Sequence, residues 1–225
     1  MRRTFKIGGK TVFVFHSNRP GSPVIYLNTY SDERQKIYEA VQATGCPPFT
    51  LVTVSNLAWN HDMAPWDSPA AFKKGERFTG GAGDYLRLLV EEIIPRAEKE
   101  LAEPPVWRGI AGYSLAGLFA LYAIYRTDVF SRVGCMSGSL WFPGFKEYIF
   151  SHEPKRRPDC IYFSLGDKEA KTRNSVLKTV QENTEEIQAF YQSKGIDTVF
   201  QLNPGNHFVQ GIERTIAGIQ WLLRR

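Results

Sequence analysis

The fold of this chain is indicated most clearly by residues 106–125, VWRGIAGYSLAGLFALYAIY. Its first part, up to Tyr113, is an apolar run typical of a buried strand, and its last part has the apolar character of a buried helix. Small residues occupy the junction, because Gly112 lies two positions before Ser114 and Ala116 lies two positions after it. The pattern predicts a sharp strand-to-helix turn that exposes the Ser114 hydroxyl at the carboxyl edge of a sheet.

Similar apolar runs recur before and after this stretch, and helical patterns lie between them. The expected strands cover residues 24–27, 49–54, 129–137, 160–166 and 198–203. Strands that alternate with helices form a mostly parallel sheet with helices on both faces. The sequence therefore predicts an α/β fold with a doubly wound sheet, arranged as a three-layer α/β/α domain.

The two ends of the chain add an edge hairpin and a final helix. Residues 2–7 and 11–16 are short strand patterns joined by two glycines, which predicts an antiparallel hairpin at one edge of the sheet. One helix is expected over 32–43 and another over 86–101, where Pro95 predicts a kink or break. The apolar face of the last helix is expected to run from Phe208 through Ile212, Ile216 and Ile219 to Leu223.

Length and composition narrow the classes of protein that the chain can belong to. The 225 residues carry 28 Lys and Arg against 23 Asp and Glu, which gives a formal net charge of +5. A chain of this length forms one domain, residues 1–225, with a core that needs no disulfide or metal. No apolar run approaches the roughly 20 residues of a membrane-spanning helix, and the basic residues are scattered. Neither a membrane nor a nucleic acid is therefore expected as a partner.

Cysteine and histidine usage gives no sign of a metal or a redox site. Cys46, Cys135 and Cys160 are widely spaced without a C-x-x-C pair, and the histidines lack the spacing of metal ligands. We expect reduced thiols, no metal and no cofactor. The amino terminus MRRTFKIGGK has no apolar segment of the kind found in secretory signals, so a cytoplasmic location is expected.

The segment 57–80 does not follow the alternation of strands and helices. It is long and rich in aromatic residues, among them Trp59, Trp66 and Phe72. Loops of this length are uncommon unless they have a function. We expect the segment to form a wall or partial lid over a pocket, with His61 as a further substrate contact, although its aromatics would equally serve to pack against the body of the domain.

Ser114 is the candidate nucleophile. Ala116 stands where the G-x-S-x-G pattern has its last glycine, and Gly117 follows at once. The first amides of the helix after Ser114 have no intrahelical partner and favour negative charge. We expect the amide of Leu115 to be one oxyanion donor. The second donor is expected after the strand at 24–27, from the amide of Thr29 or Tyr30.

A serine nucleophile needs a base, and His207 is the candidate. It lies in the turn-rich loop NPGNHF after the last strand, at the carboxyl edge of the sheet, whereas His16 follows the amino-terminal hairpin and His152 lies in a polar loop. An acid must hold the base in one tautomer. Glu169 is favoured because the chain has left the strand there, and Asp167 is the alternative.

These residues resemble those of α/β-hydrolases of the esterase D and enterochelin-esterase-like group over nearly the whole chain. The motifs that carry the resemblance are GYSLAG at 112–117, SGSLW at 137–141, SLGDKEAKTRN at 164–174 and NHF at 206–208. WNHDMAPW at 59–66 also resembles the pocket-forming loop of such esterases. The resemblance implies that Ser114, His207 and Glu169 are nucleophile, base and acid. Trp141, at the end of another strand, is expected to line the substrate pocket, although a tryptophan there would equally serve as part of the core.

The sequence thus predicts a serine carboxylesterase that acts on a small-molecule ester through an acyl-enzyme. An acyltransferase or a thioesterase would use the same residues, and a catalytically silent binding domain would keep the same fold. The positive charge and the aromatic loop suit an anionic, aromatic ester of the siderophore type, and they equally suit short-chain acyl esters.

Overall fold

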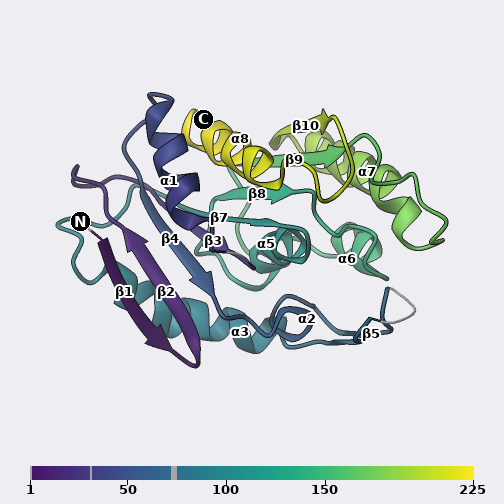
Figure 1. Cartoon of the computed structure of the whole chain (residues 1–225), viewed down its shortest axis with the longest axis horizontal. Coiled ribbons are helices and arrows are strands. Elements are labelled where there is room, and N and C mark those ends of the chain that lie inside the picture. The colour runs from purple at the N-terminus through teal and green to yellow at the C-terminus, as the bar shows by residue number, and fades with distance from the viewer. Residues whose placement is uncertain (1, 31, 72–74) are drawn as a thin grey trace.

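The computed structural model describes residues 2–30, 32–71 and 75–225. Within these residues, eight strands form one sheet in the order β1-β2-β4-β3-β7-β8-β9-β10 (Figure 1). The strands are β1 (Arg2–Ile7), β2 (Lys10–Phe15), β3 (Val24–Asn28), β4 (Thr50–Ser55), β7 (Arg108–Tyr113), β8 (Arg132–Met136), β9 (Cys160–Gly166) and β10 (Asp197–Asn203). The run from β4 to β10 is parallel, and the β1/β2 hairpin joins it antiparallel through β4. The predicted sheet and its edge hairpin are confirmed.

Helices cover both faces of the sheet and bury its apolar side chains. On one face lie α1 (Arg34–Ala43) and α8 (Gly211–Leu223), which are neighbours in Figure 1 and share a core with β3 and β4. The other face is covered by α3 (Ala82–Leu88), η1 (Leu89–Ile93), α4 (Ile94–Glu98), α5 (Leu115–Arg126), α6 (Phe145–Ser151) and α7 (Val180–Ser193). The buried strands of the central sheet therefore lie between two layers of helices, as predicted.

The helix expected over 86–101 is interrupted, as Pro95 predicts. A π-helical turn, η1, ends at Ile93, and α4 begins at Ile94 with the proline in its first turn. Proline has no amide to donate, so the first turn of a helix accommodates it best. The expected start of the last helix is wrong, because α8 begins at Gly211 and Phe208 lies in the preceding loop with 87% of its surface exposed.

The segment 57–80 contains a short helix and short strands that the hydrophobic periodicity of the sequence does not predict. They are α2 (Trp59–Asp62), β5 (Asp67–Ser68) and β6 (Phe78–Thr79). A buried ion pair between Lys10 and Asp62 ties α2 to the hairpin, and Asp62 also accepts the Ala58 amide. Phe72, which the sequence places in this segment, lies outside the described residues.

Across the described ranges, no helix is both long and apolar enough to cross a bilayer.

Candidate active site

Ser114 lies at the predicted turn between β7 and α5, in a backbone conformation that side chains rarely adopt. Its φ is 61° and its ψ is −126°. Such strain persists only where neighbouring structure holds it. The Ser114 amide donates to the Met136 carbonyl at 3.0 Å, and the Ser114 carbonyl accepts the amides of Gly117 and Ser139. The hydroxyl is thus presented at the carboxyl ends of β7 and β8.

Gly112 makes room for this turn. A Cβ at this position would lie 2.3 Å from the backbone carbon of Ala116 and 2.5 Å from its Cβ. The close approach of strand and helix therefore depends on Gly112, and it leaves space for the Ala116 side chain, which is fully buried. This explains why alanine is accommodated where the G-x-S-x-G pattern has glycine.

We expect Gly112→Ala to lower the free energy of unfolding by about 1–3 kcal/mol or more, because the added methyl group meets backbone atoms that cannot move freely. Thermal unfolding followed by circular dichroism measures the change. Gly83→Ala is the matched control, since its Cβ would meet only the Tyr122 hydroxyl at an ordinary 3.6 Å within a helix. Equal melting temperatures for the two variants would contradict the steric account.

His207 lies beside Ser114 although 93 positions separate them. Its Nε2 atom is 3.0 Å from the Ser114 Oγ atom. His207 comes from the loop between β10 and α8, and because β7 and β10 are parallel, their carboxyl ends share one edge of the sheet. The imidazole is 29% exposed, so it is open to solvent on one side.

Glu169 lies on the far side of the imidazole. Its Oε2 atom is 2.7 Å from Nδ1 of His207, and its side chain is only 4% exposed. The chain turns back after β9, as the Glu169 amide donates to the Gly166 carbonyl. Asp167, the alternative acid, instead accepts the Gly205 amide at 2.8 Å and so supports the loop that carries His207.

The environment of Glu169 favours its charged form. Burial raises the pKa of Glu169, but the hydrogen bond and charge of His207 lower it, and so do the hydrogen bonds from the Gly166 amide and the Ser137 hydroxyl. The net effect is a pKa for Glu169 below its ordinary value of 4.5. A carboxylate that accepts several hydrogen bonds behaves in this way.

The lowered pKa of Glu169 predicts a pH-dependent contribution to stability. A carboxyl whose pKa is lower in the folded than in the unfolded protein stabilises the fold above the unfolded pKa and loses this contribution as pH falls through the folded pKa. We expect the difference in free energy of unfolding between the protein and Glu169→Gln to be constant near pH 7 and to shrink below about pH 4.5. Urea titrations at several pH values measure it.

Glu153→Gln controls for the loss of one negative charge, since that side chain is 76% exposed. A difference for Glu169→Gln that is equal at pH 7 and at about pH 3.5 would contradict the predicted linkage.

Three further side chains contact the Glu169 and His207 pair, and sequence reasoning did not predict them. Ser137 donates to Oε1 of Glu169 at 2.8 Å, and Arg214 donates to the same oxygen at 2.8 Å. The Tyr113 hydroxyl donates to the His207 carbonyl at 2.7 Å. Arg214 lies one helical turn before Gly218, on the buried side of α8 that faces the sheet. A charged residue in this otherwise uncharged row was the sequence signal that could have identified it.

The two oxyanion candidates after β3 differ in their hydrogen bonding. The Thr29 amide donates to the Val54 carbonyl at 2.9 Å and so extends the ladder between β3 and β4. The Tyr30 amide is therefore the better candidate for the second oxyanion donor at this edge of the sheet. Leu115 is the first residue of α5, so its amide lies among those that the helix itself does not satisfy.

Two cavities meet at Ser114 and His207. The α8 cavity, of about 750 Å³, lies toward α1 and α8 and includes Tyr30 and Ile212. The β9 cavity, of about 450 Å³, lies toward the turn after β9 and includes Trp141 and Lys168. Five residues line both cavities: Trp59, Asn60, Ser114, His207 and Phe208. The hydroxyl of Ser114 is therefore reachable from two sides.

The predicted substrate contacts fall into two groups. Trp59 and Trp141 line the cavities. Trp66 instead donates from Nε1 to the Pro143 carbonyl at 3.0 Å and packs against aromatic rings of α6, and His61 pairs with the Thr79 hydroxyl. The structure does not bring Trp66 and His61 to Ser114, because their positions serve the packing of segment 57–80.

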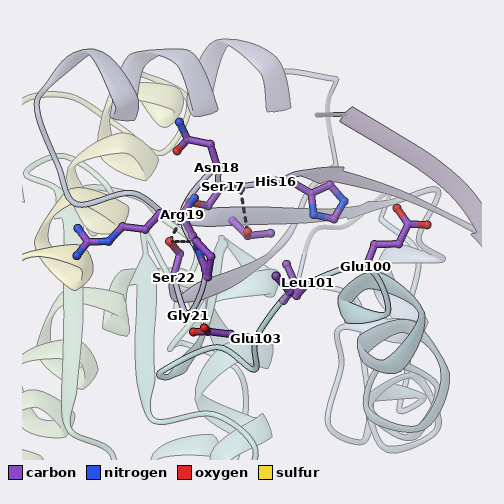
Figure 2. A pocket seen from close by; sticks show the side chains of 12 residues that line it. His16, Ser17, Asn18, Arg19, Gly21, Ser22, Glu100, Leu101 and Glu103 are labelled. Atoms are coloured by element: carbon purple, nitrogen blue, oxygen red, sulfur yellow. Dashed lines mark hydrogen bonds between the residues drawn. The ribbon is translucent and has the colours of Figure 1, made fainter.

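The other histidines lie away from this edge. His16 lines a separate cavity of about 210 Å³ beside Glu100, at the amino ends of the parallel strands (Figure 2). His152 stacks on Tyr148 with ring centroids 4.3 Å apart, just after α6. Within the part of the chain that is described, no group of three or more His, Cys, Asp or Glu side chains is arranged to hold a metal ion.

Comparison with solved structures places the fold among α/β-hydrolases. An IroE-like serine hydrolase from Shewanella oneidensis superposes with a TM-score of 0.82 at 18% identity, covering 100% of this chain and 80% of that one. The siderophore hydrolase EstA from Aspergillus nidulans superposes with a TM-score of 0.76 at 16% identity, covering 100% of this chain and 93% of that one. At these identities the likeness is one of fold.

Sequence comparison gives the family. The uncharacterized protein YbbA from Bacillus subtilis (strain 168) is 26% identical over a match that covers 92% of this chain and 88% of that protein. The model of the family described as "Putative esterase" matches residues 13–218, which is most of the chain. The match spans the Ser114 turn, Glu169 and His207, and the chain therefore belongs to the esterase family.

Proposed function

We propose that this esterase is a serine carboxylesterase in which Ser114, His207 and Glu169 form a catalytic triad. The observation that carries the proposal is one continuous chain of contacts, with 3.0 Å from Ser114 Oγ to His207 Nε2 and 2.7 Å from His207 Nδ1 to Glu169 Oε2. Both distances lie within hydrogen-bonding reach of a nucleophile, a base and the acid that orients the base.

The first half of the reaction forms an acyl-enzyme. Ser114 Oγ attacks the ester carbonyl carbon while its proton passes to Nε2 of His207. Glu169 stays ionised and stabilises the imidazolium through Nδ1. When the tetrahedral intermediate collapses, the bond to the leaving alcohol breaks, and the alcohol oxygen takes the proton from Nε2.

The negative oxygen of the tetrahedral intermediate needs hydrogen-bond donors. The amide of Leu115 at the start of α5 is the first donor, and the Tyr30 amide is the second, because the Thr29 amide is already bonded to Val54. Amides fixed by a strand end and a helix start need no reorganisation when charge develops.

Water completes the cycle. It attacks the acyl carbon while His207 takes its proton, and the carboxylic acid leaves as Ser114 recovers its proton. The partly exposed imidazole is reachable by this water. If an alcohol or a thiol replaced the water as acceptor, the same residues would catalyse acyl transfer.

The two cavities support a substrate with a sizeable group on each side of the scissile bond. The β9 cavity is lined by the aromatic rings of Phe78 and Trp141, by Lys168 and Lys171, and by the carboxylate of Glu76. The two lysines suit an anionic group on an aromatic substrate. This is the chemistry of a catecholate siderophore ester, and several solved structures with this fold carry the names of siderophore or enterobactin hydrolases. Short-chain acyl esters are the simpler alternative.

Product analysis tests the reaction class. The protein is incubated with 4-nitrophenyl acetate and a tenfold excess of a competing alcohol or thiol, and the products are separated by chromatography. We expect acetate and nitrophenol in equal amounts. Acetylated alcohol or thiol as the main product would assign an acyltransferase, and the absence of any turnover across a panel from acetate to trilactone esters would favour a silent binding domain.

A pair of substrates tests the charge preference. We expect the double variant Lys168→Gln and Lys171→Gln to raise KM for the anionic 4-acetoxybenzoate by about three- to tenfold, and to leave KM for neutral 4-nitrophenyl acetate unchanged. Lys178→Gln is the matched control, because this exposed lysine does not border the β9 cavity as the structure describes it. Equal effects on both substrates would remove the basis for an anionic ester.

A further inference from the structure

A fully buried arginine lies directly behind the candidate triad. Arg214 is in the first turn of α8, the helix that follows the His207 loop, and only 1% of its surface is exposed. A charge removed from water is costly unless it is paired and hydrogen-bonded. The partners of this arginine therefore indicate why it is there.

The guanidinium of Arg214 contacts Glu169 and the backbone of the loop that carries His207. One nitrogen, Nη1, donates to Glu169 Oε1 at 2.8 Å and to the Ser137 hydroxyl at 3.0 Å. The other, Nη2, donates to the carbonyls of Pro204 and Asn206 at 3.1 and 3.2 Å. Asn206 immediately precedes His207, so one rigid group links the carboxylate to the loop that carries the imidazole.

The two carboxylate oxygens of Glu169 have different hydrogen-bond partners. Oε1 accepts from Arg214, from Ser137 and from the Gly166 amide at 2.6 Å. Oε2 is directed at His207. A carboxylate held on one oxygen by several donors cannot rotate freely, so the oxygen that faces the imidazole stays in place.

A further contact fixes the backbone at His207. Nη1 of Arg214 lies 3.2 Å from the Tyr113 hydroxyl, and that hydroxyl donates to the His207 carbonyl at 2.7 Å. Tyr113 directly precedes Ser114. The arginine thus joins the segments that carry the nucleophile, the acid and the base.

Gly166 keeps the space that the guanidinium needs. A Cβ at this position would lie 2.7 Å from Nη2 and 2.2 Å from the Gly205 carbonyl oxygen. The end of β9, the His207 loop and the arginine therefore fit together only with glycine at this point.

We propose that Arg214 is a positioning residue that holds Glu169 and the His207 loop in register with Ser114. The inference rests on the proposed triad. Arg214 borders neither cavity in the described structure, so it acts on the rate through its neighbours and not by binding substrate. Displacement of a reacting group by about 1 Å can cost 10²-fold in rate.

A double-mutant cycle with Glu169 tests this inference. For 4-nitrophenyl acetate, we expect Arg214→Met to lower kcat by about 10²-fold and to change KM by less than about threefold. In the Glu169→Gln background the same substitution should lower kcat by no more than about fivefold, because the carboxylate that Arg214 positions is already lost and only its contacts with the His207 loop remain. A merely structural role would give equal fold-losses in both backgrounds, and that result would overturn the inference.

Variants and controls keep the test decisive. If Arg214→Met does not fold, the cycle is run with Arg214→Lys, whose single ammonium cannot bond the carboxylate and both carbonyls together and should cost about tenfold in kcat. Arg108→Met is the matched control, since it breaks a bidentate pair with Glu98 at the opposite end of β7 and should leave kcat within about twofold.

Failure of this inference can be distinguished from failure of the proposed function. If Ser114→Ala abolishes hydrolysis and the cycle is additive, the esterase mechanism stands and only the role of Arg214 is overturned. If Ser114→Ala retains normal turnover, the proposed triad fails and the inference fails with it.

Discussion

Ser114→Ala is expected to lower kcat for 4-nitrophenyl acetate by on the order of 10⁴- to 10⁶-fold, because the variant has no atom that can form the acyl-enzyme. KM should change little, since both cavities keep their walls. Initial rates measured by release of nitrophenol give both constants. Residual turnover would come from direct attack of water on the bound ester, without an acyl-enzyme.

The control for Ser114→Ala is a buried serine elsewhere. The Ser131 hydroxyl makes no hydrogen bond within the described residues, and it lies at the amino end of β8, so Ser131→Ala should leave kcat within about twofold. Turnover by Ser114→Ala at a tenth of the normal rate or more would exclude Ser114 as the nucleophile.

His207→Ala is the second change with a very large expected effect. Without the imidazole, no base among the described residues lies within hydrogen-bonding reach of the Ser114 hydroxyl. The value of kcat should therefore fall by on the order of 10⁴- to 10⁶-fold. The double variant with Ser114→Ala should be no slower than either single variant, because the residues act as one unit. Steady-state kinetics of the three variants measure this non-additivity.

His152→Ala provides the comparison for His207→Ala. This histidine stacks on Tyr148 after α6, and its removal should leave kcat within about twofold. A loss for the double variant that equals the product of the two single losses would contradict a shared role of Ser114 and His207.

The sheet and the position of Ser114 were predictable because they depend on local patterns. Apolar runs mark buried strands, and small residues around Ser114 mark the sharp turn that β7 and α5 form. Parallel strands then bring their carboxyl ends to one edge, so His207 and Glu169 were placed near Ser114 without knowledge of any contact.

Contacts between distant segments were not predictable in the same way. The choice between Glu169 and Asp167 depends on how the turn after β9 closes on Gly166 and Gly205. The hydrogen bond of the Thr29 amide depends on β4 as its neighbour. Neither neighbour is visible in the local sequence.

Burial of polar and aromatic side chains was the hardest feature to infer. Arg214 follows helical spacing like its apolar neighbours, and only the tertiary structure reveals that its partners are Glu169 and the His207 loop. Phe208 continues the apolar pattern of α8 in sequence, yet the helix starts three residues later and its ring is exposed at the cavity mouth. Trp66 in turn packs against α6.

The position of the label left by a fluorophosphonate probe shows which side chain is the nucleophile. The protein is treated with the probe, digested, and analysed by mass spectrometry for the modified residue. We expect the phosphonyl group on Ser114, no labelling in Ser114→Ala, and slow labelling in His207→Ala. A phosphonyl group on Ser139, whose hydroxyl oxygen lies 3.4 Å from that of Ser114, or undiminished labelling of Ser114→Ala, would contradict this expectation.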